Sequence, residues 1–175
     1  MKKLILSAVM LVGLAISAQA QEVRDNALGV RLGDSDGFGG EISYQRGLSN
    51  NKRLEFDLGW RNSGNYDAMK LVGLHQWVWN IDGGFNWYAG VGAGVGTWSY
   101  DRGNNNNWNN DWDDSGTFLL VAGDIGIEYV FDIPLQVSLD LRPELYFADG
   151  RNDNDFDNNY NSFGPDIALG IRFTF

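Results

Sequence analysis

Acidic and basic side chains recur at alternate positions along much of this 175-residue chain. Residues at every second position of a β-strand point to the same face, so these charges would share one side of a sheet. Charges removed from water must pair with one another or meet trapped water. The spacing predicts one polar network, made of Arg31, Glu41, Glu55, Asp57, Arg61, Asp124, Glu128, Asp140, Arg142, Glu144, Asp166 and Arg172.

Two segments, 99–116 and 148–163, are long, polar and rich in Asn and Asp. Their clustered oxygens could hold Ca²⁺, which takes 6–8 oxygen ligands, although 153–157 lacks the Gly and the distal Glu of an EF-hand loop. Tryptophans among amides could instead stack on sugar rings, whereas the composition itself favours a solvated loop. No metal site is firm and no cofactor is expected. The candidate binding residues are Trp108, Asp111, Trp112, Asp113, Asp114, Asp153, Asp155 and Asp157.

Catalysis has few candidate residues in this sequence. His75 is the only histidine, and no serine lies in a Gly-x-Ser-x-Gly turn. A general base would have to be this one residue, and a histidine in the middle of a strand is more often packed than catalytic. The chain contains no cysteine, which excludes disulfides and thiolate metal sites. We expect no enzymatic activity.

The first twenty residues have the pattern of a secretory signal. Residues 1–3 read Met-Lys-Lys, 4–16 are largely apolar, and 18–20 read Ala-Gln-Ala. We predict cleavage after Ala20, which leaves 21–175 as a single domain. The chain carries 13 Lys+Arg against 23 Asp+Glu, and such acidity repels nucleic acid.

The rest of the sequence predicts eight β-strands. No stretch after the signal offers the roughly 20 apolar residues that a membrane helix needs. In 68–79 the residues that would face either side of the strand are both largely apolar, so its two faces cannot be assigned. Trp77 and Trp79 could point inward, beside the glycines of the next strand, or outward as interface anchors. Tight and long connections alternate, as in outer-membrane barrels with periplasmic turns. The tight turns fall near 47–52, 80–85 and 131–135, and the longer links at 34–39, 62–67, 99–116 and 148–163.

Volume indicates which row of side chains faces outward. The interior of an eight-stranded barrel is just wide enough for side chains to fill, and the apolar row is too bulky for it. Aromatic residues gather at strand ends around an aliphatic middle, which suits the two interfaces of a bilayer. The predicted interface aromatics are Trp60, Trp98, Phe118 and Phe147 toward the long loops, and Trp87, Tyr129, Phe131 and Phe175 toward the short turns.

The last strand alternates from Ile167 and ends on Phe175. With the alternation over 26–175, it resembles the small eight-stranded outer-membrane barrels typified by OmpX and the membrane domain of OmpA. The resemblance implies an all-β, antiparallel, up-and-down transmembrane barrel in the outer membrane of a Gram-negative bacterium. It also implies that the barrel-assembly machinery reads the strand ending at Phe175. Since nothing follows Phe175, we expect no peptidoglycan-binding domain.

These features predict a barrel whose lumen is plugged by salt bridges and whose acidic loops serve envelope integrity or surface interaction. The expected partners are outer-membrane lipid and lipopolysaccharide, with which loop acids could share divalent cations, and we expect a monomer. One alternative is a narrow cation-preferring channel, because eight acids outnumber four arginines and the glycines at 90, 92, 94 and 96 remove volume. The other is a periplasmic, lipocalin-like binder with its apolar row inside.

Overall fold

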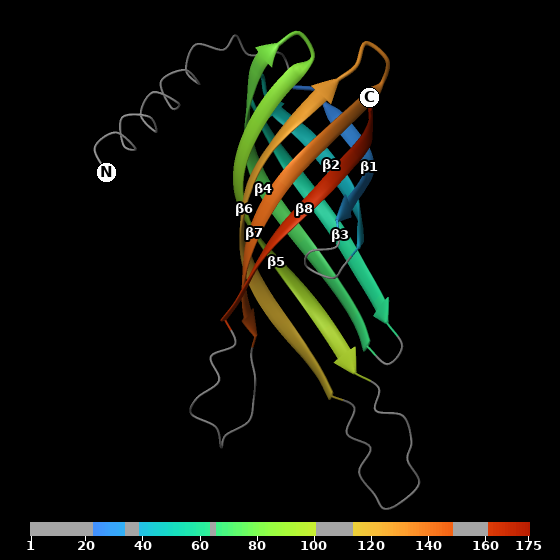
Figure 1. Ribbon diagram of the computed structural model, residues 1–175, viewed down its shortest axis with the longest axis vertical. Coiled ribbons are helices and arrows are strands. Elements are labelled where there is room, and N and C mark those ends of the chain that lie inside the picture. Colours follow the sequence, from blue (N-terminus) through green and yellow to red (C-terminus); the bar gives the residue numbers. More distant parts are fainter. Residues whose placement is uncertain (1–22, 34–38, 64–65, 101–113, 149–160) are drawn as a thin grey trace, which may run out of the picture.

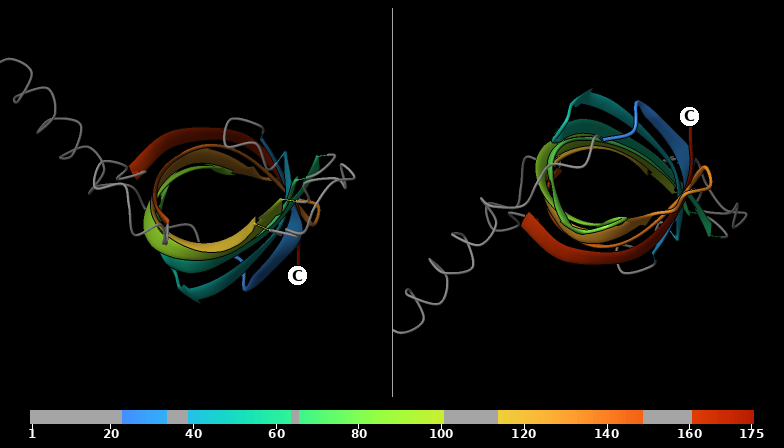
Figure 2. Two further views of the ribbon diagram at one scale, coloured as in Figure 1. Left: turned by 90° about the horizontal axis from the view of Figure 1, so that it is seen from below. Right: turned by 90° about the horizontal axis from the view of Figure 1, so that it is seen from above.

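The protein is an eight-stranded, closed antiparallel β-barrel in a computed structural model that describes residues 23–33, 39–63, 66–100, 114–148 and 161–175. Each strand pairs with its neighbours in sequence, and the last pairs with the first (Figures 1 and 2). The predicted fold class is confirmed. The strands are β1 (Asn26–Gly33), β2 (Gly40–Ser49), β3 (Lys52–Ser63), β4 (Tyr66–Asp82), β5 (Phe85–Tyr100), β6 (Asp114–Val130), β7 (Leu135–Ala148) and β8 (Asn161–Thr174).

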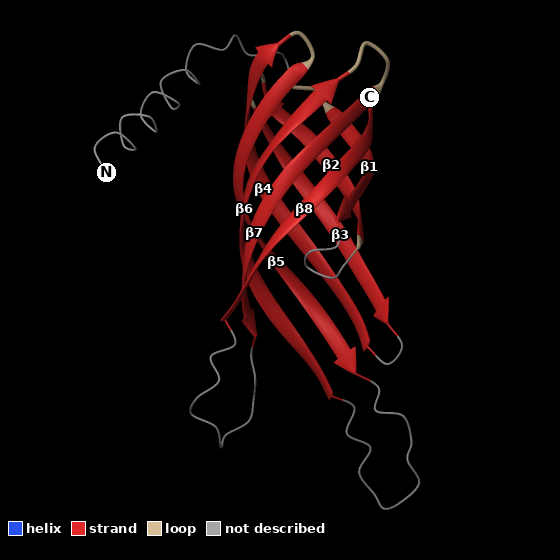
Figure 3. Ribbon diagram, viewed as in Figure 1, coloured by secondary structure: helices blue, strands red, loops and turns tan. Residues whose placement is uncertain are grey.

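The short turns all lie at one end of the barrel, which is also where the chain ends (Figure 1). They join β2 to β3, β4 to β5 and β6 to β7, as the sequence predicted. Gly83, at the tip of the β4–β5 turn, has a φ of 52°, which a glycine adopts readily. Figure 3 shows strands and loops, and no helix in the described part of the chain is long and apolar enough to cross a membrane. The proposed signal segment lies outside the described residues.

Apolar side chains cover the outside of the barrel and charged ones fill the inside. On the outer face Val91 is 57 % exposed and Leu139 is 49 % exposed, whereas Arg142 and Glu144 on the inner face are fully buried. This is the reverse of a soluble protein, and it is the arrangement that a bilayer requires. The lipocalin-like alternative, which needs the apolar row inside, is therefore wrong.

The structure also settles the two faces of β4. Val72, Leu74 and Gln76 are buried in the lumen. Trp77 and Trp79 belong to the opposite row of the strand and therefore point outward. Trp79 stacks on Trp87 of β5 with ring centroids 4.3 Å apart, so these tryptophans belong to the outer aromatic band and not to the lumen.

Candidate functional site

The lumen is the candidate site, and Arg31 of β1 organises its centre. Its Nη1 donates to Glu41 Oε2 at 3.0 Å and to Asp166 Oδ2 at 2.5 Å. Its Nε reaches past β8 to Asp140 Oδ1 of β7 at 2.9 Å. All four side chains are buried, so one guanidinium ties β1, β2, β7 and β8 together.

Arg142 of β7 forms the second centre. It donates to Asp57 of β3 and, at 3.2 Å, to Glu41 of β2, and its Nη2 lies 3.5 Å from Glu55 Oε1. Strands β3 and β7 are not neighbours in the barrel. The pair therefore crosses the lumen instead of running along its wall.

Arg172 of β8 makes a further crossing. Its Nη2 donates to Glu55 Oε1 of β3 at 2.9 Å, and its Nε and Nη1 donate to Ser43 and Ser138 at 2.9 and 2.8 Å. Each of the three nitrogens of this planar group thus donates one hydrogen bond, which offsets part of the cost of burying a guanidinium.

A layer closer to the short turns centres on Arg53 of β3. Its Nη1 donates to Glu128 of β6 and its Nε to Gln76 of β4, both at 2.6 Å. Glu128 also accepts from Gln136 of β7 at 2.7 Å, and Gln136 donates to Gln45 of β2 at 3.1 Å. This layer therefore spans the full width of the barrel.

Toward the long loops the lumen becomes apolar. Lys70 of β4 still donates across the lumen to Glu144 of β7, at 3.1 and 3.2 Å. Beside this pair a cluster of buried residues packs together, and two half-buried aromatic side chains lie against it. The cluster comprises Val72, Leu74, Phe118, Leu120 and Ala122, and the two aromatics are Trp98 and Tyr146.

All of the predicted network residues except Arg61 are buried in the lumen. Arg61 is exposed at the loop end of β3, where its guanidinium lies 5.5 Å from the Tyr66 ring centroid. Its placement in the network was wrong, because strand alternation does not show where the lumen ends. Sequence reasoning also missed Arg53 and Lys70. Arg53 lies two residues before Glu55 and could have been found by extending the alternation of β3. Lys70 could not, because residues on both faces of β4 are largely apolar and the inward face was not assigned.

Two predicted interface aromatics are also corrected. Phe118 is buried and Trp98 packs against the lumen cluster, so both point inward. Phe118 occupies space left by Gly96, where an added Cβ would lie 2.1 Å from the phenyl ring, and Trp98 likewise covers Gly116. The remaining six predicted aromatics belong to the outward rows: Trp60, Phe147, Trp87, Tyr129, Phe131 and Phe175.

The predicted loop site lies almost wholly outside the described residues. This applies to Trp108, Asp111, Trp112, Asp113, Asp153, Asp155 and Asp157, while Asp114 begins β6. In the part of the chain that the structure describes, no group of three or more His, Cys, Asp or Glu side chains could hold a metal ion. Calcium binding by the loops stays a prediction.

No protein-family model matches the sequence, and neither does any curated protein. Solved structures do match in fold. Neisserial surface protein A aligns with a TM-score of 0.58 and 14% identity, over 86% of this chain and 94% of its own. The N-terminal β-barrel domain of Pseudomonas aeruginosa OprF gives 0.55 and 12%, over 89% and 100%. Ail, the attachment invasion locus protein of Yersinia pestis, gives 0.50 and 14%, over 86% and 96%.

The chain has the fold of the small eight-stranded outer-membrane barrels. The resemblance stated from the alternating strands and the final Phe175 is thereby confirmed at the level of the fold. At 12–14% identity the likeness extends to the fold alone, so any function must be argued from the residues of this chain.

Proposed function

We propose that this protein is a non-enzymatic outer-membrane barrel whose plugged lumen makes it a rigid, non-conducting support for its surface loops. The observation that carries the proposal is the set of ion pairs that cross the lumen between strands that are not neighbours. Arg142 pairs with Asp57, and Lys70 pairs with Glu144. An ion passing along the axis would have to break these pairs in succession.

Tight packing at the turn end of the lumen supports the same proposal. At the turn end, a hollow bounded by Arg53, Glu128 and Gln136 has a volume of about 10 Å³, and a cavity needs on the order of 10–15 Å³ to hold one water molecule. A hollow of about 600 Å³ lies at the opposite end, between the tips of β3 to β6. The barrel thus has a mouth toward the loops and a packed floor.

The proposed task is surface interaction or envelope integrity, carried by the loops at the open end. The name of Ail refers to attachment and invasion and that of the neisserial protein to the surface, which favours an interaction role for a barrel of this shape. The absence of catalysis is supported by His75, which points outward beside Trp77, with ring centroids 4.7 Å apart, and so lies away from the acids of the lumen.

Planar-bilayer recording of the purified protein tests the plug. We expect no discrete conductance steps from the natural chain, because each crossing pair closes the path. A variant with Arg142→Ala and Arg31→Ala serves as the matched control, since it removes both centres and leaves their acids, and it should admit cations. The competing function is a narrow cation path, favoured by the excess of buried acids over buried bases. Cation-selective steps from the natural chain would establish it in place of the plug.

A further inference from the structure

The outward face of the barrel is apolar except in one region. Among the described strand residues, the cationic and histidine side chains of the outward rows are Arg46 on β2, Lys52 on β3 and His75 on β4. The outward acids of the described strands are both on β4: Asp67 lies near its opposite end, and Asp82, which a bulge places opposite Phe85, lies at the turn tip. Three adjacent strands thus carry all the outward bases, whereas β5 to β8 and β1 carry none in their described outward rows.

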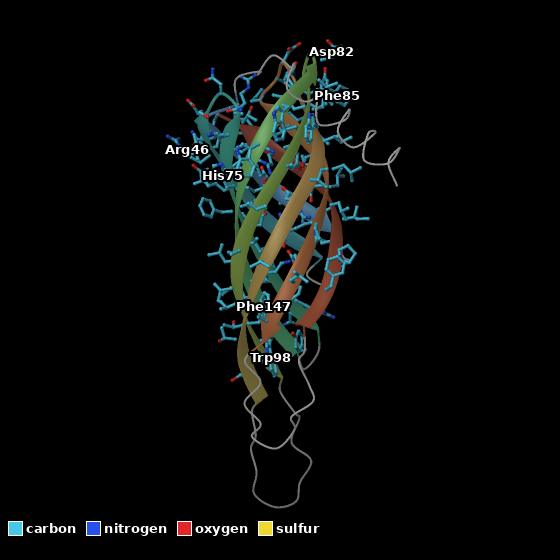
Figure 4. The ribbon with its side chains drawn as sticks, turned by 90° about the vertical axis from the view of Figure 1, so that its left-hand side faces the viewer. Arg46, His75, Asp82, Phe85, Trp98 and Phe147 are labelled. Carbon is cyan, nitrogen blue, oxygen red and sulfur yellow. The ribbon has the colours of Figure 1, made fainter. Side chains whose placement is uncertain are left out.

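The strand register brings these three side chains together. Arg46 pairs with Leu54 of β3, which in turn pairs with His75, and Lys52 pairs with Trp77. Neighbouring strands are about 4.8 Å apart, so the Cα atoms of Arg46 and His75 are about 10 Å apart across Leu54. Figure 4 shows Arg46 and His75 at a similar level, in the half of the barrel near the short turns.

The charges in this region are not neutralised within the described chain. Arg46 Nη1 donates to the amide oxygen of Asn26 at 2.8 Å, and the Tyr44 hydroxyl donates to the same oxygen at 2.8 Å. This neutral partner orients the guanidinium without cancelling its charge. Among the described residues, neither Arg46 nor Lys52 forms an ion pair, whereas lumen bases such as Arg53 are paired with acids.

We propose that the outward faces of β2, β3 and β4 near the short turns bind the phosphate of an anionic phospholipid. The inference rests on the proposed outer-membrane function, in which the turns face the phospholipid leaflet. Arg46 and Lys52 donate to phosphate oxygens, for which a guanidinium is well shaped, and His75 supplies a further donor. Trp77 lies at headgroup level, while Leu54 offers apolar surface to the acyl chains.

Native mass spectrometry of the folded protein in detergent tests this site. Phosphatidylglycerol is the anionic probe, and phosphatidylethanolamine is the zwitterionic one. We expect one phosphatidylglycerol to bind at least tenfold more tightly than phosphatidylethanolamine. The double variant Arg46→Gln, Lys52→Gln should lose this preference. Arg61→Gln is the matched control, because it removes an exposed cation from the other end of β3 and should leave the preference unchanged.

Three results would overturn the lipid site. These are equal retention of the two lipids by the natural chain, equal weakening by Arg61→Gln, and displacement of the lipid by millimolar inorganic phosphate, which would indicate a site for free anions. The folded state of each variant is checked by its mobility in cold SDS. A natural chain that shows no compact form in cold SDS would refute the membrane barrel itself. A folded barrel that binds both lipids equally would refute only the phosphate site.

Discussion

At the scale of single residues, the lumen depends on a few arginines that each satisfy several acids. Arg142 contacts Asp57 and Glu41, and all three are buried. A buried pair contributes little net stability when intact, because desolvation offsets the attraction, but removing one partner leaves an uncompensated charge. Removing one of these arginines therefore lowers stability mainly because its acidic partners stay buried without a counter-charge.

We predict that Arg142→Met lowers the free energy of unfolding by about 3–5 kcal/mol, since Asp57 loses its cation in a site without water access. Urea unfolding of the protein in lipid vesicles measures the change. Arg61→Met is the control, because exposed substitutions usually change stability by less than about 0.5 kcal/mol. Equal stability of the two variants would show that the lumen acids are solvated.

Much of this network could be predicted from the sequence, because an eight-stranded lumen accepts only the row that combines small and charged residues. Glu55 and Asp57 follow directly from that reasoning. The errors have physical reasons. Arg61 keeps the inward alternation beyond the point where the lumen opens, and Phe118 and Trp98 were assigned from their nearness to strand ends although their row faces inward. Alternation gives the face of a residue but not its depth.

At the scale of elements, the glycines of β5 allow the β4–β5–β6 wall to pack closely. A Cβ added at Gly92 would lie 2.0 Å from the Gly73 carbonyl oxygen, and one at Gly90 would lie 2.8 Å from the Gln76 side chain. Side chains of the neighbouring strands, Gln76 and Phe118, thus occupy the space beside Gly90 and Gly96, while Gly92 is required by the close backbone of β4. The faces of β4 could not be predicted, because Val72 and Leu74 fill an apolar part of the lumen that charge alternation does not reveal.

We predict that Gly92→Ala sharply reduces the fraction of chains that refold into vesicles, at least severalfold, because the obstructing atom is backbone and cannot rotate away. Gly164→Ala on β8 is the matched control, since an added Cβ there meets no atom within 4 Å. Refolding yields of both variants are compared by the proportion that resists SDS in the cold. Equal yields would mean that β4 and β5 can separate without loss of the fold.

At the scale of the whole molecule, closure of the barrel removes every long sheet edge. Strand β8 pairs with β1, with Ile171 opposite Val30, and the closure is completed by the Phe175 amide donating to the Asn26 carbonyl at 2.9 Å. In a bilayer an unpaired strand edge costs several kcal/mol per backbone group. Strands β1 and β8 must therefore pair for the fold to exist. The number of strands could be predicted because each alternating run is bounded by turn residues, whereas their register required the structure.

Closure of the barrel can be tested on the intact protein by SDS electrophoresis of membrane fractions. The mobility of the unboiled sample is compared with that of the boiled sample. We predict that the unboiled protein migrates as a compact form and shifts on heating, because a closed hydrogen-bonded barrel unfolds only as a unit. Ile171→Pro should abolish the compact form, since proline removes a ladder donor from the strand that lies between Val30 and Val137. Ile171→Val keeps the donor and should retain the shift. A compact form that survives Ile171→Pro would mean that β8 is not needed to close the barrel.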